Sequence, residues 1–413
     1  MESAPLPAPN VFRHRSFALF WGSRFLLNLA VQIESVAIGW QVYAVARQTR
    51  SVQESALLVG MVGLVQFLPL FFLSFIGGAV ADRFERRLVV QICLAVETVC
   101  VAALAWLALH PSPSLVPIFA IAAVFGGARA FLAPANSAMA PMLVPRDELP
   151  RAIAWNSMAW QGAAITGPFL GGILVAGSAA VAYGSATAMY AAAAIILLFL
   201  KADTRPVNAV SPGIKAIREG LAYVWTNKVV LGAISLDLFA VLLGGATALL
   251  PVFARDVLHV GASGFGVLRA APSVGAVVAA LYLSRNPLQR RAGLWMFLGV
   301  GVFGLGTIVF ALSQWIWLSV IALAALGAGD MVSVNVRQTL VQIVTPDHMR
   351  GRVSAVSSLF VGASNELGEF ESGVMARLLG PIGAALFGGI GSVGVTLLWA
   401  KMFPTLRKVD RLT

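Results

Sequence analysis

Long apolar segments alternate with short polar turns along almost the whole of this 413-residue chain. A helix needs about 20 apolar residues to cross the hydrocarbon core of a bilayer, and twelve segments meet that requirement. Only 11% of the residues are charged, against roughly a quarter in soluble proteins. We therefore expect an all-α membrane protein with twelve transmembrane helices, in the windows 17–44, 57–81, 88–109, 115–137, 152–176, 179–200, 229–253, 265–284, 293–312, 315–335, 353–375 and 382–401.

The twelve windows form two sets of six, separated by a longer hydrophilic link. When the sequence is aligned with itself at an offset of 200 positions, five residues after span four match identical residues after span ten. Two parallel six-helix repeats produce this pattern. The matched residues are Val144, Asp147, Ser157, Gly162 and Ala163, with Val344, Asp347, Ser357, Gly362 and Ala363 as their counterparts.

The link between the two sets has its own pattern. Its apolar residues recur at helical spacing beside Lys215 and Arg218, which is typical of a helix lying in the membrane interface. It is too short for an independent core. The expected parts of the chain are a cytoplasmic lead at 1–16, a first half at 17–200, the link with its interfacial helix at 201–228, a second half at 229–403 and a cytoplasmic tail at 404–413.

The basic residues gather on one side of the predicted helices. With the amino terminus inside, 22 of the 29 Lys and Arg fall in segments on that side, while Arg24, Arg129 and Arg269 fall within spans. Because Lys and Arg are enriched in cytoplasmic loops, both termini are expected in the cytoplasm. The net charge of +11 then follows from topology and predicts no nucleic-acid partner. The four basic residues on the other side are Arg47, Arg50, Arg255 and Arg377.

A charged turn separates the second and third windows. Gly78 is expected to allow two helices to approach closely, and Asp82 can form a charge-assisted pair with Arg83. Arg86 and Arg87 hold the turn on the cytoplasmic side. We expect these five residues to form a gate motif that closes the cytoplasmic side in one conformation. The alternative is a loop whose arginines only orient the helices.

This turn, together with the twelve spans in two halves, resembles the major facilitator superfamily, whose signature between helices two and three reads G-x-x-x-D-R-x-G-R-R. The chain has Glu85 where glycine is usual, a departure shared by the branch that resembles the bacterial enterobactin exporter and the macrolide efflux proteins. The stretches 141–150 and 250–266 are similar to the same branch. The resemblance implies two six-helix halves around a central cavity and transport by alternating access.

A third motif bears on the direction of transport. Gly167, Pro168, Gly171 and Gly172 resemble the antiporter signature of this superfamily, G-x-x-x-G-P-x-x-G-G, although Ala163 replaces its first glycine. The resemblance implies export. Physically, Pro168 removes a helix hydrogen bond and bends the span, and the small residues allow a close contact with an opposing helix, for which span eight is a candidate. The alternative is ordinary packing of small residues.

Ionisable residues inside the predicted helices are the main functional candidates, because buried charges are costly and need a partner or a role. In this superfamily helices one, four, seven and ten line the cavity, and here they carry Glu34, Arg129, Asp237 and Asp330. We expect the three acids to be proton-coupling groups and Arg129 to be a switching counter-ion or a contact for anionic substrate groups. Arg129 and Asp330 could pair in one state. The alternative is a fixed charge pair that braces the helices.

Further polar residues are expected at the cavity wall or its mouth. They are Arg24, Asn28 and Gln32 on span one, and Glu366 and Glu369 on span eleven. The two glutamates have the alternative of helix–helix hydrogen bonds. Trp21, Trp40 and Phe239 are aromatic candidates for the substrate cavity. Glu97 in span three has no assigned role, and Cys93 and Cys100 are expected to be small packing residues.

Enzymatic activity is not expected. The four histidines lie far apart, and no metal spacing, nucleophile elbow or phosphate-binding loop is present, so we expect no cofactor and no metal. The function expected is proton-coupled antiport of a siderophore-like or antibiotic-like compound out of the cell, by a monomer in the bacterial inner membrane. A proton-symport importer of a nutrient and a non-transporting scaffold or sensor are the alternatives.

Overall fold

The computed structural model describes residues 11–110, 114–205, 214–286, 288 and 290–410. In the first half of the chain, six long helices follow one another with short turns between them. They are α1 (Arg15–Ala46), α2 (Val52–Arg83), α3 (Arg86–Leu109), α4 (Val116–Met139), α5 (Leu149–Gly177) and α6 (Ala179–Leu198), with short 3-10 turns at Val11–Arg13 and Ala140–Met142.

The second half begins with a short helix and continues with five longer ones. They are α7 (Ile214–Thr226), α8 (Lys228–Leu243), α10 (Gly261–Arg285), α11 (Ala292–Leu312), α12 (Ile316–Val344) and α13 (Asp347–Met402), and α14 (Pro404–Arg407) follows. The most carboxyl-terminal long helix, α13, is broken at Gly380, whose φ of 75° is accessible mainly to glycine. Pro381 follows and donates no backbone hydrogen bond, so α13 supplies two spans.

Within the described residues, eleven segments are long and apolar enough to cross a membrane. The break in α13 divides one of them, so the prediction of an all-α protein with twelve transmembrane helices is confirmed. Helix starts are fixed by side chains where the sequence supplies them. The Ser51 hydroxyl accepts a hydrogen bond from the Glu54 amide while the Glu54 carboxylate accepts one from the Ser51 amide, and Asn227 caps α8.

The seventh predicted span is confirmed as the apolar segment Lys228–Val257, but it is not one continuous helix. Helix α8 ends at Leu243, and the chain continues through a 3-10 turn (Ala246–Leu249), α9 (Leu250–Val252) and a π-turn (Phe253–Val257). The cause is the glycine pair that follows α8. A Cβ built on Gly245 would lie 2.3 Å from the Gly368 carbonyl oxygen, so only glycine admits α13 so close to this backbone.

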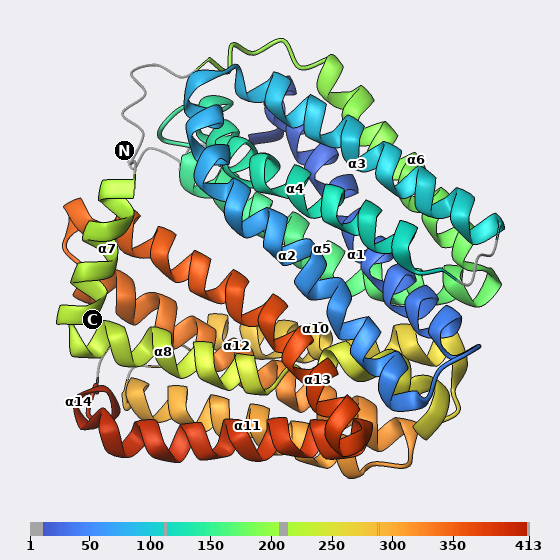
Figure 1. Ribbon diagram of the computed structural model, residues 1–413. Helices are drawn as coiled ribbons and strands as arrows, with labels where there is room; N and C mark the ends of the chain where they lie inside the picture. The colour runs from blue at the N-terminus through green and yellow to red at the C-terminus, as the bar shows by residue number, and fades with distance from the viewer. Residues whose placement is uncertain (1–10, 111–113, 206–213, 287, 289, 411–413) are drawn as a thin grey trace, which may run out of the picture.

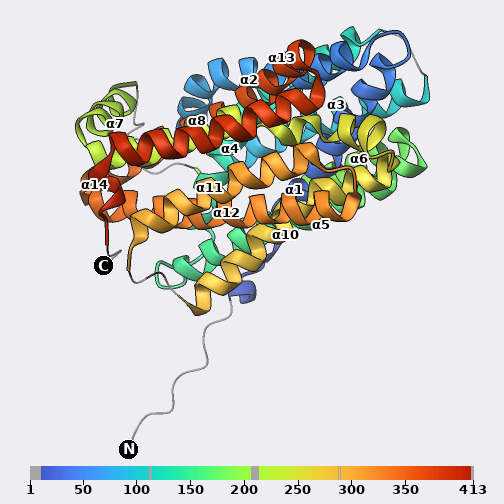
Figure 2. The same cartoon turned by 90° about the horizontal axis from the view of Figure 1, so that it is seen from below.

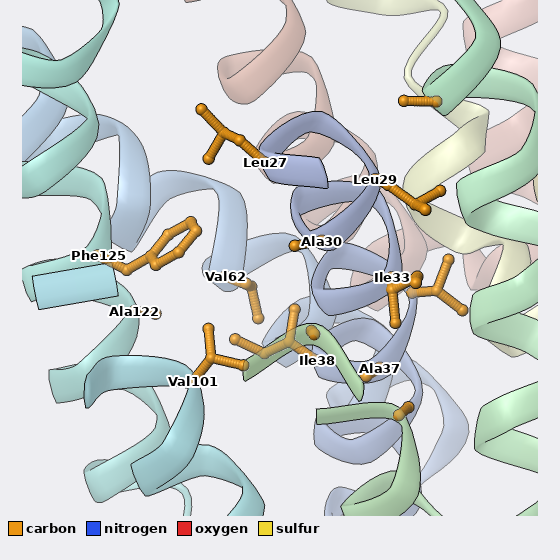
Figure 3. Packing of buried hydrophobic residues seen from close by; sticks show 14 of the residues in the cluster. Leu27, Leu29, Ala30, Ile33, Ala37, Ile38, Val62, Val101, Ala122 and Phe125 are labelled. Atoms are coloured by element: carbon orange, nitrogen blue, oxygen red, sulfur yellow. The ribbon is translucent and has the colours of Figure 1, made fainter. Parts of the chain in front are cut away.

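Each half packs as its own helical bundle (Figure 1). In the first half α1 lies at the centre and packs on α5 and α6, while α4 packs on α2 and α3. Figure 3 shows Ala30 and Ile38 of α1 on the side of the helix toward Val101 of α3 and Phe125 of α4, with Ile33 on the opposite side. This buried layer holds α1 in place, and α1 carries several of the candidate polar residues.

The two halves meet through two helix pairs, α2 with α13 and α5 with α10. Both contacts are tightest at glycines: the Cβ of an alanine at Gly60 would lie 2.9 Å from the Gly373 Cα, and one at Gly172 would lie 2.3 Å from the Gly266 Cα. These glycines lie near the beginning of α2 and α10 and near the end of α5. The close contacts are therefore confined to one end of the molecule.

We call this the closed end; it is defined by the turn after α1 and by Asp256, whose carboxylate accepts hydrogen bonds from Tyr43 at 2.5 Å and Arg47 at 3.2 Å. The basic end is defined by the α2–α3 turn, α7 and α14, and Figures 1 and 2 both place α7 and α14 together there. Toward it the halves diverge (Figure 1), and Met158 on α5 and Tyr282 on α10 are exposed. The conformation is closed at one end and open at the basic end.

The predicted interfacial helix corresponds to α7, which packs against α13 and α8 of the second half. Glu219 forms an ion pair with Arg352 at 2.7 Å, and the Tyr223 hydroxyl donates a hydrogen bond to the Val344 carbonyl. The part of the link at 206–213 lies outside the described residues.

Candidate functional site

Three cavities meet around one aromatic side chain, Trp160 of α5. The largest has a volume of about 820 Å³ and lies between α5 and the helices of the second half. A smaller one of about 270 Å³ lies between the two halves, and a third of about 380 Å³ lies between α1, α4 and α5. Because all three share Trp160 in their walls, we refer to them together as the central cavity.

The smaller cavity gathers charged residues from both halves. Glu34 on α1 and Arg129 on α4 face Arg269 on α10 and Glu366 and Glu369 on α13. The guanidinium of Arg269 lies 3.9 Å from the Glu369 carboxylate and donates a hydrogen bond of 3.2 Å to the Thr247 carbonyl. We call these five residues the interface cluster. Three acids and two arginines therefore lie together at one place between the two halves.

Arg269 is the member of the interface cluster to which the sequence assigned no role. The sequence showed only that it lies within a span. Its position is set by the break after α8, because the Thr247 carbonyl that accepts its hydrogen bond belongs to the 3-10 turn there. A turn of that kind leaves carbonyl groups free to accept hydrogen bonds from side chains. In a continuous seventh helix the Thr247 carbonyl would accept a backbone hydrogen bond, so a prediction of a continuous helix gave no partner for Arg269.

A second charged group lies inside the second half. The Asp237 carboxylate on α8 forms an ion pair with Arg337 on α12, and both side chains are almost completely buried. Asp330 lies about two turns before Arg337 on the same helix, and both line the largest cavity. The sequence analysis predicted Asp237 and Asp330 as site residues but assigned Arg337 to a cytoplasmic loop.

That placement of Arg337 was wrong. Helix α12 continues to Val344, and the Arg337 side chain is 5% exposed. The apolar window ended at residue 335 because charged and polar residues follow it, but the Asp237 carboxylate compensates the buried cation. Among the described ion pairs Arg129 is paired with neither Asp237 nor Asp330, so the expected pair of Arg129 with Asp330 is not formed in this conformation.

The polar residues of span one divide between two cavities. Arg24 lines the third cavity together with Asn156, and Gln32 lines the small cavity with Glu34. Within the part of the chain that is described, the Arg24 Nε and the Asn28 Nδ2 have no hydrogen-bond acceptor. The free donor of Arg24 lines a cavity and is suited to bind a polar substrate group, whereas Asn28 is not among the residues that line these three cavities.

The gate motif makes its contacts within the first half. Arg86 donates hydrogen bonds to the Ala81 carbonyl at 3.3 Å and the Ala138 carbonyl at 3.1 Å, and Arg87 donates one to the Leu200 carbonyl. The motif thereby ties the end of α2 to the ends of α4 and α6. It lies at the basic end, which is open in this conformation.

Two details of the gate motif differ from expectation. Asp82 lies 3.9 Å from Arg86 and forms no described pair with Arg83, because residues four apart on a helix face each other and adjacent ones do not. The glycine that allows close approach is Gly77, where a Cβ would lie 2.2 Å from the Ala130 carbonyl oxygen, whereas nothing lies within 4 Å of a Cβ at Gly78.

The glycines of the antiporter motif bring α5 into contact with two helices. A Cβ on Gly167 would lie 2.4 Å from Gln32 Cβ, and one on Gly171 would lie 3.0 Å from Val36 Cβ, both on α1. Gly172 contacts Gly266 on α10. Pro168 lies between these contacts inside α5. The motif therefore lies where the first half touches the second at the closed end.

The aromatic candidates from the sequence pack elsewhere. Trp21 stacks on Phe25, Trp40 stacks on Phe265, and Phe239 packs against Trp399. Trp160, which the sequence did not single out, lines all three cavities and is 52% exposed. Hydropathy places a tryptophan in a helix but does not show which way that helix is rotated, so Trp160 could not be distinguished from the others.

Replacing Trp160 with alanine is expected to weaken substrate binding by about tenfold, because an aromatic side chain covered by bound substrate contributes on the order of 1.5 kcal/mol. The KM of transport in proteoliposomes measures this change. Trp317→Ala is the matched control, since Trp317 is exposed at the start of α12 and should leave the KM unchanged. Equal effects of the two substitutions would contradict a substrate contact at Trp160.

An additional hollow of about 710 Å³ lies between α2, α3 and α4. Its wall is made only of apolar residues, among them Phe84, Leu88 and Ile92, which are exposed on the outer surface of the bundle. It contains none of the charged residues described above. We therefore place the functional site in the central cavity.

The chain is similar to known exporters along almost its whole length. The sequence profile of the transmembrane secretion effector family matches residues 7–411. Enterobactin exporter EntS of Citrobacter koseri is 28% identical over 403 residues, which cover 96% of this chain and 93% of that protein. EntS of Shigella boydii is also 28% identical over 403 residues, with the same coverage.

Solved structures agree on the fold. The POT family transporter PepTSo superposes with a TM-score of 0.75 at 13% identity, covering 96% of this chain and 99% of that one. A bacterial homologue of the lysosomal transporter Spinster gives 0.72 at 13% identity, covering 95% and 96% of the two chains. The chain therefore belongs to the transmembrane secretion effector family within the major facilitator superfamily, and it is a membrane transporter, not an enzyme.

Proposed function

We propose that the protein exports a small organic compound across the bacterial inner membrane by alternating access, in exchange for protons. The interface cluster carries this proposal. Its charges come from both halves, so a rocking motion of one half against the other changes which acid each arginine faces. A carboxylate that loses its arginine takes up a proton, and one that gains an arginine releases it. Conformation and protonation are thereby linked.

Glu34, Asp237 and Asp330 are the proton-coupling groups in this proposal. Glu34 lies in the interface cluster beside Arg129, which acts as its switching counter-ion. Asp237 is held by Arg337 in the present conformation, and Asp330 lies on the same helix as that arginine, within the cavity. If the Arg337 side chain moved from Asp237 to Asp330, Asp237 would lose its cation and take up a proton. Asp330 would gain the cation and release its proton.

The substrate is a siderophore-like or antibiotic-like compound. The relatives at 28% identity are enterobactin exporters, and the largest cavity, of about 820 Å³, is within the usual range of about 300–1,000 Å³ for small-molecule sites. Arg24, Asn28 and Gln32 bind its polar groups on one side of the cavity, and Glu366 and Glu369 form the opposite wall. The antiporter motif at Gly167–Gly172 also favours export.

The basic end faces the cytoplasm in this proposal, with both termini on that side. The gate motif lies at this end, where its described hydrogen bonds and ion pairs are with the first half, and it closes this end when the halves rock to the other state. A monomer suffices, because the cavity lies between the two halves of one chain. The parts of the chain are those expected above: a lead at 1–16, halves at 17–200 and 229–403, a link at 201–228 and a tail at 404–413.

Glu34→Gln and Asp330→Asn are each expected to lower pH-gradient-driven transport by at least about tenfold while leaving substrate exchange at equal pH intact. A neutral side chain keeps the shape of the cavity but removes a proton-binding group. The measurement uses proteoliposomes loaded with a panel of siderophores and macrolides, with and without an imposed pH gradient.

Glu54→Gln is the matched control, because Glu54 is an exposed capping residue at the closed end. Undiminished gradient-driven transport in both cavity variants would remove the coupling assignment. The direction is tested separately in inside-out vesicles: uptake driven by an acidic interior supports export by antiport, and uptake driven only by the opposite gradient would support an importer.

A further inference from the structure

Glu97 on α3 is a carboxyl group in a position that the transport proposal does not use. Its side chain is 0% exposed, and among the described residues neither carboxyl oxygen has a hydrogen-bond partner. It also forms none of the described ion pairs. An ionised carboxylate without a partner is costly inside a membrane protein, so the neutral form, which carries a proton, is the one this site can hold.

A tyrosine hydroxyl near Glu97 is also unpartnered. The hydroxyl of Tyr190 on α6 is fully buried and has no hydrogen-bond partner within the described part of the chain, although buried tyrosine hydroxyls usually find one. Tyr183 on the same helix shows the usual arrangement, since its hydroxyl donates to the Gln41 side chain at 2.7 Å. Two unsatisfied polar groups in one apolar layer indicate a site whose partners change.

Arg129 connects this layer to the central cavity. The Tyr190 ring packs against the Phe125 ring at 6.3 Å between centroids, and Phe125 lies one turn before Arg129 on α4. Arg129 and Glu34 both line the small cavity, whereas Glu97 is not part of its wall. Arg129 forms no described ion pair. The arginine therefore lines the cavity together with Glu34, on a helix that also packs against α3, which carries Glu97.

The titratable groups around Glu97 come from four helices. Cys93 and Cys100 flank it on α3, and electrostatic interactions connect it with Tyr190 of α6, Arg129 of α4 and Glu34 of α1. Helix α2 also touches α3, and its charged residues lie near its two ends: Glu54, Asp82 and Arg83. Arg129 is a cation that interacts electrostatically with both buried acids.

We propose that Glu97 is a second proton-binding site of the first half, which exchanges its proton with Glu34 as Arg129 changes partner. The inference rests on the proposed proton coupling and extends it. When Arg129 turns toward α3, the Glu97 carboxyl releases its proton and the resulting carboxylate pairs with the guanidinium. Glu34, which has lost its cation, takes up that proton, so no charge or electron is gained or lost. A proton held at Glu97 is kept away from the water of the cavity.

The test measures protons directly on the purified full-length protein in detergent, without substrate and without a gradient. A pH step is followed by proton uptake and by infrared difference spectroscopy of the carbonyl stretch of protonated carboxyl groups. Glu97→Gln is expected to remove one carbonyl band and to lower the uptake by roughly one proton per chain. Glu34→Gln is expected to shift the pH at which the Glu97 band disappears, because the two groups share one cation.

Tyr190→Phe provides a second readout, since loss of the neighbouring hydroxyl should move the frequency of the Glu97 band, while Tyr183→Phe should leave it in place. Unchanged proton uptake and an unchanged band in Glu97→Gln would overturn the proposal. A band that persists at every pH and ignores Glu34→Gln would also overturn it, because Glu97 would then be a permanently neutral packing residue. Failure of gradient-driven transport alone would contradict the proposed function and would not alter these measurements.

Discussion

Replacement of Arg337 by glutamine is expected to destabilise the folded protein strongly, because it leaves the Asp237 carboxylate buried without its cation. Removing one partner of a buried ion pair typically costs roughly 3–5 kcal/mol. The thermal unfolding midpoint in detergent should fall, and less protein should elute as a single species in size-exclusion chromatography.

The double variant Asp237→Asn with Arg337→Gln is expected to recover most of that stability, because no uncompensated charge remains. Arg352→Gln is the matched control. Its pair with Glu219 is partly exposed to solvent on both sides, so its loss should cost at most about 1 kcal/mol. If the single and double Arg337 variants were equally unstable, the damage would come from lost packing and not from the unpaired carboxylate.

Gly172→Val is expected to abolish transport while leaving a folded protein. A Cβ at this position would lie 2.3 Å from the Gly266 Cα, and the contact is between two backbones that no side-chain rotation can separate. Helices α5 and α10 must move apart, so the variant cannot form the contact that closes this end of the molecule. The population is expected to shift toward a state open at that end, because a difference of about 5.5 kcal/mol already reverses a two-state equilibrium.

Distances between spin labels at Ile153 on α5 and Tyr282 on α10 measure this shift. Both side chains are exposed toward the basic end, and the label-to-label distance should shorten in Gly172→Val as that end closes. Gly184→Val is the control, since nothing lies within 4 Å of a Cβ there. A distance distribution identical to that of the unmodified protein, with normal transport, would show that the helices tolerate the valine.

The fold could be predicted from the sequence because the hydropathy of each segment indicates whether it lies inside the membrane. The twelve spans, the repeat and the charged turn all depend on where polar residues fall along the chain. Of these predictions, the all-α fold with twelve spans in two six-helix halves is confirmed. Even the last two spans, which the structure joins in α13, were separable at Gly380 and Pro381. The exceptions are local, as at the glycine pair that ends α8.

The site was less predictable because its geometry depends on helix rotation and on partners far apart in the chain. Glu34, Glu366 and Glu369 were recognised as charges in spans, but nothing in the sequence showed that Arg269 would face them. Arg337 was assigned to a loop because its counter-ion, Asp237, is a hundred positions away. The spans are apolar on nearly all sides, so periodicity does not show which side meets the cavity.

The pair of Arg47 with Asp256 makes the transport cycle sensitive to the ionic strength of the medium at the closed end. The hydrogen bond from Arg47 to Asp256 raises the pKa of Arg47 above its usual value, so the guanidinium keeps its charge at any physiological pH. Its side chain is partly exposed, and dissolved ions screen charges over roughly 8 Å at physiological salt. Salt on that side is expected to weaken the pair and to favour opening there.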